Sequence, residues 1–231
     1  MSAQASLVLL GSTPISGAGL GNVSTILTLQ SPASSTIEGG CVLPGATPGT
    51  GTQCSAFGSS TAFAAGTVQT GASQIGSPTL GSLGITRAED LRIILNATEP
   101  AANSIVVEQL VLNLFNGAIV LGTTHTLAAP QTIANTQTGV GNAGFAFALN
   151  TAEAIAVNAL LNALPSATRN AVQIGLAARI SDAAGGPETF FAANAGALPP
   201  PVGAAAIPEP ASVALVGSAL LAAGLLRRRP R

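Results

Sequence analysis

The chain of 231 residues carries very little charge. Only 7% of its residues are charged, against about a quarter in a typical soluble domain, and lysine is absent. Four of its eight basic residues lie within the last five positions, and before position 207 four arginines stand against eight acidic residues, a formal charge of −4. Because this body has no basic patch, its composition argues against a nucleic-acid-binding protein.

The chain also lacks Trp and Tyr and has a single His. Without these aromatic platforms, sugar binding by stacking is disfavoured, so any affinity for polysaccharide would have to come from Thr, Asn, Gln and backbone groups. One histidine cannot build a histidine-rich metal site. Glu89-Asp90 alone approaches the spacing of a carboxylate Ca²⁺ loop, and we expect this pair to face water or cap a turn. We expect neither a cofactor nor a metal.

His125 is the candidate catalytic base. A triad would need it beside a serine and Asp90 or Asp182, but its place among threonines at a strand end favours an ordinary exposed polar residue. Residues 139–144 (GVGNAG) match the dinucleotide fingerprint, yet they enter an alternating strand instead of a helix, which favours a Gly-rich loop. The sequence thus predicts a protein that is not an enzyme, with a hydrolase using His125 as a minor alternative.

The only two cysteines, Cys41 and Cys54, bracket a loop rich in Gly, Pro and Thr. In an oxidising compartment, closing a loop of this length stabilises the fold by roughly 3 kcal/mol. We expect a disulfide, and two unrelated thiols are the alternative.

Most of the chain is predicted to form antiparallel strands. An alternating run comprises Val23, Thr25, Leu27 and Leu29, and strand patterns recur in five later stretches: 91–95, 104–115, 145–149, 174–180 and 189–192. Asn116-Gly117 predicts a hairpin with a type I′ turn, in which these two residues take positive φ. The fold class expected is therefore mainly β, an antiparallel β-sandwich.

One short helix is predicted among the strands. Asn150 can cap it, Glu153 follows at the capping-box spacing, and Pro165 ends it. Its apolar positions at helical spacing are Ile155, Ala156, Ala159, Leu160, Ala163 and Leu164. We place this helix across the rim of the sandwich.

Composition divides the chain into four parts. Residues 1–86 are rich in Gly, Ser and Thr and form part of the sandwich or lead into it, and residues 87–194 form its core. Residues 195–206 (AGALPPPVGAAA) are a linker stiffened by proline. Residues 207–231 (IPEPASVALVGSALLAAGLLRRRPR) form a separate C-terminal segment.

This segment predicts a single transmembrane helix. Ala211–Leu226 is uncharged over sixteen residues, about 24 Å as a helix, which is a marginal span for a bilayer; a buried core helix is the alternative. By the positive-inside rule, the arginines that follow would be cytoplasmic and the body exported: Arg227, Arg228, Arg229 and Arg231. Pro208-Glu209-Pro210 cannot lie inside a helix and is predicted to be extended and accessible at the membrane surface.

The order of Pro-Glu-Pro, apolar helix and arginine cluster resembles the PEP-CTERM sorting signal of Gram-negative bacteria, a signature also known as the ice-binding protein C-terminal domain. The resemblance covers the last 25 residues. It implies that exosortase, a membrane-embedded cysteine transpeptidase, recognises Pro208–Pro210, removes the tail and passes the protein to the cell surface or extracellular polymer.

An exported protein needs an entry signal, and the apolar run Leu7–Leu10 is too short for one. Ala3-Gln4-Ala5 has the small-x-small pattern that ends a signal peptide, so we expect the true start to lie upstream of Met1. The function expected is a structural or adhesive role at the cell surface or in the extracellular matrix, after an inner-membrane intermediate. The alternative is a surface module that binds polysaccharide or ice, although the sequence has no regular Thr ladder to favour ice.

Overall fold

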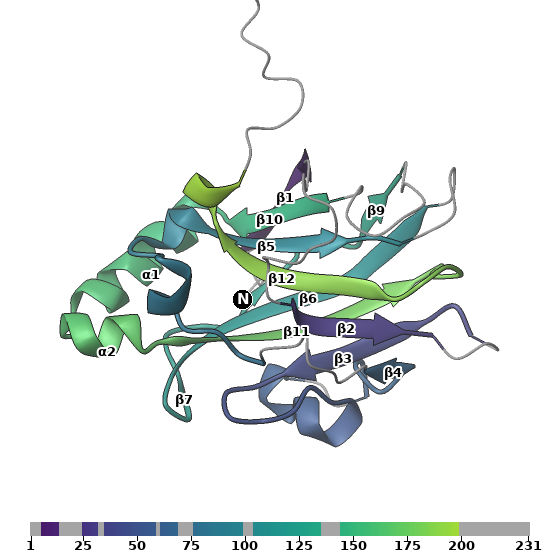
Figure 1. Ribbon diagram of the computed structural model, residues 1–231, viewed down its shortest axis with the longest axis horizontal. Helices are drawn as coiled ribbons and strands as arrows, with labels where there is room; N and C mark the ends of the chain where they lie inside the picture. The colour runs from purple at the N-terminus through teal and green to yellow at the C-terminus, as the bar shows by residue number, and fades with distance from the viewer. Residues whose placement is uncertain are drawn as a thin grey trace, which may run out of the picture. The chain divides into compact units, whose positions relative to one another are not determined.

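The computed structural model describes residues 6–13, 25–31, 35–58, 61–68, 76–98, 104–134 and 144–198. Over these ranges the chain is mainly β, with antiparallel sheets and few helices, as the alternating sequence predicted. Figure 1 shows the strands as two stacked layers with helices α1 and α2 at one end. The compact unit that contains them runs from Met1 to Pro199.

The strands form two sheets. The first has the order β1 (Leu7–Thr13), β10 (Gly144–Leu149), β5 (Leu91–Asn96), β12 (Glu188–Asn194), β2 (Thr25–Gln30) and β4 (Thr67–Val68). The second has the order β3 (Glu38–Val42), β11 (Gln173–Ser181), β6 (Ile105–Asn116) and β7 (Ile119–Val120), with β8 (His125–Thr126) and β9 (Gln131–Ile133) also paired to β6. Strands from residues 1–86 therefore lie in both sheets, beside strands from residues 87–194.

Alternation along each strand sends side chains to opposite faces of its sheet. On β6, Leu110 and Leu112 lie in the main hydrophobic cluster, whereas Val111 lies in a second, smaller cluster. On β10, Phe147 lies in the main cluster and Ala146 in a third. Because the main cluster takes residues from both sheets, the sheets bury their facing sides against each other and share one core.

The predicted hairpin between β6 and β7 is present, but its turn differs from the prediction. Asn116 pairs with Ile119, so the two loop residues are Gly117 and Ala118. Gly117 has φ +63°, and neither Asn116 nor Ala118 has positive φ. A glycine at the first loop position with no second positive φ is the requirement of a type II′ turn. The predicted type I′ turn was wrong because pairing of Asn116 within the ladder moves the loop by one residue.

Helix α1 (Thr151–Asn162) begins as predicted, with Oδ1 of Asn150 accepting a hydrogen bond from the Glu153 N–H at 2.8 Å. Its predicted apolar face was wrong. The buried residues are Ala154, Val157 and Leu161, while Ile155 is 65% exposed. Apolar residues occur on every side of this helix, so its packing on β10 and on the short 3-10 helix η3 (Ala88–Asp90) selects the buried side.

A second helix, α2 (Ser166–Asn170), follows Pro165, and three further 3-10 helices complete the described elements: η1 (Gly51–Phe57), η2 (Gly81–Leu83) and η4 (Ala195–Ala197). Within the ranges that the structure describes, no helix has the length and hydrophobicity to cross a bilayer. The predicted span 211–226 and strand residue Val23 lie outside the described residues.

Candidate functional site

The two cysteines form the predicted disulfide. Cys41 lies on β3 and Cys54 in η1, with 5.6 Å between their Cα atoms and both side chains at most 2% exposed. Cys41 pairs with Ala177 of β11, so the two side chains point to the same face of the second sheet, away from the main core. The disulfide therefore ties η1 over the outer face of this sheet.

Three further interactions hold the loop between the cysteines. Cys41 and Gly49 exchange two backbone hydrogen bonds of 2.8 Å. Pro44 and Gly45 form a turn in which the Ala46 N–H donates to the Leu43 carbonyl at 3.2 Å, and Gly45 has φ +69°. Proline followed by a glycine with positive φ is the sequence of a type II turn. The loop therefore has a defined backbone conformation that these hydrogen bonds stabilise.

Apolar packing and an ion pair hold the adjacent segment on the same face. Phe57 and Phe63 pack with the disulfide and with Val111 of β6 in the second hydrophobic cluster. Arg179 donates to the carboxylate of Glu108 and, through Nη1, to the Ala62 carbonyl at 3.1 Å. The hydrogen bond from Arg179 is the main reason that the pKa of Glu108 lies below its ordinary value.

A surface cavity of about 360 Å³ lies within the disulfide loop. Its lining residues come from both ends of the loop: Cys41, Leu43, Gly45, Ala46, Thr47 and Gln53. Sequence analysis predicted the disulfide but not this cavity. The available signal was the concentration of turn-forming Gly and Pro between the cysteines, which indicates a folded loop without giving its shape.

His125 is buried, contrary to the prediction of an exposed residue. Its side chain is 1% exposed, because β8 pairs His125 with Leu112 of β6, whose side chain faces the main core. Nδ1 of His125 lies 3.3 Å from Oε2 of Glu153, and among the described residues Nε2 has no hydrogen-bond partner. Burial lowers the pKa of His125 below its ordinary value of 6.5, and Glu153 opposes this shift only in part.

The residues proposed for a triad are arranged differently. The carboxylate beside His125 is Glu153, and neither Asp90 nor Asp182 forms an ion pair with it in the described part of the chain. Ser6 lies next to β8, where its Oγ accepts from the Thr126 N–H at 2.7 Å and donates to the Thr126 carbonyl at 3.4 Å. The Ser6 hydroxyl is therefore occupied by backbone groups.

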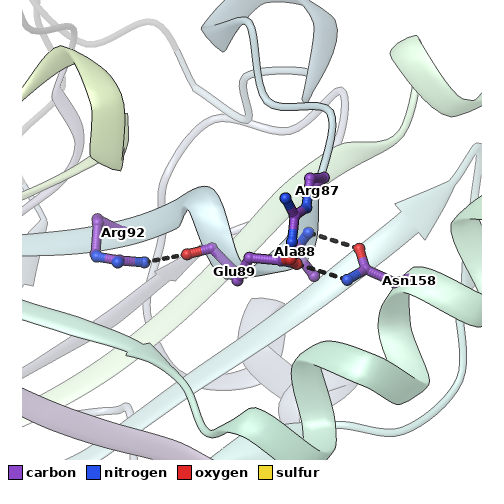
Figure 2. Close-up of polar contacts among 5 residues, drawn as sticks. All are labelled: Arg87, Ala88, Glu89, Arg92 and Asn158. Carbon is purple, nitrogen blue, oxygen red and sulfur yellow. Dashed lines mark hydrogen bonds and ion pairs between the residues drawn. The ribbon is translucent and has the colours of Figure 1, made fainter.

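Glu89 belongs to a polar junction between η3 and α1, shown in Figure 2. Asn158 of α1 accepts from the Ala88 N–H at 2.8 Å and donates to Glu89 Oε2 at 2.6 Å. Glu89 also pairs with Arg87, and its carbonyl accepts from Nη1 of Arg92 at 2.6 Å. Burial lowers the pKa of Arg92. These contacts join a helix to a strand start, which is a structural role.

Two buried carboxyl groups were not predicted. Glu38 at the start of β3 is 1% exposed and accepts from the Ser31 N–H at 2.6 Å, and Glu188 at the start of β12 is 0% exposed. No three His, Cys, Asp or Glu side chains gather into a metal-binding group within the described ranges. The alternation of residue types along the strands did not indicate that Glu38 and Glu188 would be buried.

The predicted sorting and topology residues lie outside the described part of the chain: Pro208, Glu209, Pro210, Arg227, Arg228, Arg229 and Arg231. Ala3-Gln4-Ala5 and residues 139–143 of the Gly-rich motif also lie outside it. Gly144, which ends that motif, begins β10 as predicted. Comparisons with family models, with curated proteins and with solved structures each found no match.

Proposed function

We propose that this chain is an exported protein of a Gram-negative cell surface or extracellular matrix, with a β-sandwich body in a structural or adhesive, non-enzymatic role. The observation that supports export is the buried disulfide between Cys41 and Cys54. Disulfides persist in oxidising compartments and are rare in the cytosol of most organisms. A body with few charged residues and a disulfide-tied loop suits a protein that works outside the cytoplasm.

The C-terminal segment gives the proposed route. Residues 211–226 span the inner membrane, and the terminal arginines, being costly to translocate, hold the C-terminus in the cytoplasm. Exosortase then cuts near Pro208–Pro210 and releases the body to the surface. Membrane and exosortase are thus the partners proposed for the tail, and extracellular polysaccharide is the partner proposed for the body.

Cell fractionation tests this route in the native host or in a bacterium that expresses an exosortase. The protein is followed with an antibody to the body and with a C-terminal epitope tag. We expect the exported body to lack the tag and to resist thiol alkylation until it is reduced. A matched variant with Pro208→Ala, Glu209→Ala and Pro210→Ala should keep its tag and stay in the membrane. One intact, tagged and alkylatable species in the cytoplasm would refute the proposal.

The second candidate is a ligand-binding module presented at the same surface. The cavity in the disulfide loop supports it, because a binding site requires a concave surface with polar groups at fixed positions. Thermal hysteresis of the soluble body tests ice binding, and direct titration tests binding of small molecules.

A further inference from the structure

The geometry of the disulfide loop points to a binding site for a neutral saccharide unit, with Thr47 and Gln53 as the hydrogen-bonding side chains. This inference names a ligand class for the second candidate function and rests on it. It does not depend on how the tail is processed, because the lining residues in the described part of the chain all come from the disulfide loop.

The lining of the cavity selects against ions. None of its six lining residues carries a charge, so a charged ligand would lose hydration without gaining a counter-charge. Thr47 contributes a hydroxyl and Gln53 a carboxamide, and each of these groups can both donate and accept hydrogen bonds. Leu43 adds apolar surface. A neutral sugar matches this mixture because it carries hydroxyl groups together with C–H surface.

The volume of the cavity and its accessibility from solvent fit a single sugar unit. The volume of about 360 Å³ lies at the small end of ligand cavities, which run from about 300 to 1,000 Å³. Thr47 and Gln53 are exposed, as are Gly45 and Ala46, whereas Leu43 is half-buried and Cys41 is buried, so the two polar side chains are accessible from solvent. A unit of a longer glycan can enter while its neighbours remain in solvent.

The walls of the cavity are fixed before any ligand arrives. The disulfide holds Cys54, the residue after Gln53, against β3, and the backbone pairing of Cys41 with Gly49 ties the middle of the loop to the same strand. A Cβ at Gly49 would lie 1.3 Å from Oε1 of Gln53, so only glycine lets the Gln53 side chain take this position. Prior ordering lowers the entropy cost of binding, which matters for a site without aromatic stacking.

The experiment is an NMR titration of the purified protein with maltose, cellobiose and N-acetylglucosamine, and with glucose 6-phosphate as the charged comparison. We expect at least one neutral sugar to shift backbone amides of residues 41–54, with millimolar affinity. Gln53→Ala should weaken that sugar about tenfold, the equivalent of 1.4 kcal/mol. Gln109→Ala, at an exposed glutamine of β6, should leave affinity unchanged.

The inference is overturned if none of the neutral sugars shifts these amides at about 50 mM, well above a millimolar Kd. It is also overturned if glucose 6-phosphate binds as well as the sugars, or if Gln53→Ala binds as tightly as the unaltered protein. The spectrum of each variant shows directly whether it is folded. Export is scored separately by fractionation, so failure of either proposal leaves the result for the other intact.

Discussion

Nδ1 of His125 lies 3.3 Å from Oε2 of Glu153, and this contact joins strand β8 to the first turn of helix α1. The imidazole is 1% exposed, and its burial lowers its pKa below 6.5. As the pH falls, His125 is therefore protonated in the unfolded chain at a higher pH than in the folded chain. Its contribution to stability is therefore complete above pH 6.5 and is lost as pH falls from 6.5 through the lower, folded-state pKa.

We therefore expect the free energy of unfolding to decrease below pH 6.5, with a slope of at most about 1.4 kcal/mol per pH unit for this one proton. Urea unfolding at pH 7.5 and pH 5.5 measures the effect. The His125→Gln variant should lose this dependence, since it removes the titrating group while keeping a polar side chain. Equal slopes in the two proteins would contradict the assignment to His125.

The junction around Asn158 gives a second prediction. Asn158→Ala removes the acceptor for the Ala88 N–H, which belongs to a residue only 3% exposed, and also the donor to Glu89. Leaving a buried donor without a partner costs about 1–3 kcal/mol, which urea unfolding detects. Asn162→Ala, at an exposed site on the same helix, should change stability by no more than about 0.5 kcal/mol.

The Asn158→Asp variant separates the two halves of this junction. It keeps an acceptor for the Ala88 N–H but places a second carboxylate beside Glu89, where like charges repel. We expect this variant to be less stable relative to the unaltered protein at pH 7 than at pH 4, where the added carboxyl can be protonated and donate. A stability difference that does not change with pH would show that charge at this position is unimportant.

Loss of the disulfide is expected to cost about 3 kcal/mol, because the cross-link removes conformational entropy from the unfolded chain. Urea unfolding with and without a reductant measures this cost. The Cys41→Ser, Cys54→Ser variant should match the reduced protein and should not respond to the reductant. If the oxidised and reduced proteins unfold at the same urea concentration, the loop does not contribute to global stability.

The β6–β7 turn can be tested with two alanine substitutions. Gly117→Ala places a Cβ at φ +63° and should cost about 1–2 kcal/mol of unfolding free energy, although nothing lies within 4 Å of that Cβ. Asn116 does not have positive φ, so Asn116→Ala should cost much less. A cost at Asn116 comparable to that at Gly117 would favour the type I′ turn that the sequence predicted, because both residues have positive φ in that turn.

Several elements followed directly from the sequence because they depend on neighbours along the chain. Strands β5, β6, β10 and β11 have apolar residues at alternate positions, and in each strand these alternate residues lie in the main hydrophobic cluster. The start of α1 depends on one side chain reaching an N–H three residues later. The disulfide was predictable because the full sequence contains only two cysteines.

Other features depended on pairing between distant segments. The burial of His125 follows from its register opposite Leu112, which a two-residue strand cannot indicate by itself. The buried side of α1 follows from what the helix rests on, since apolar residues surround it. The cavity is lined by residues from both ends of the disulfide loop, which only the fold of that loop brings together.

The positions of these strands, the helix cap and the cross-link follow from the sequence alone, since each depends on residue types at short or unique spacings. Which side chains are buried depends on the tertiary structure, because burial requires another segment to lie over a given face. The packing of distant segments buries His125 beside Glu153 and places the disulfide loop, with its uncharged cavity, on the outer face of the second sheet.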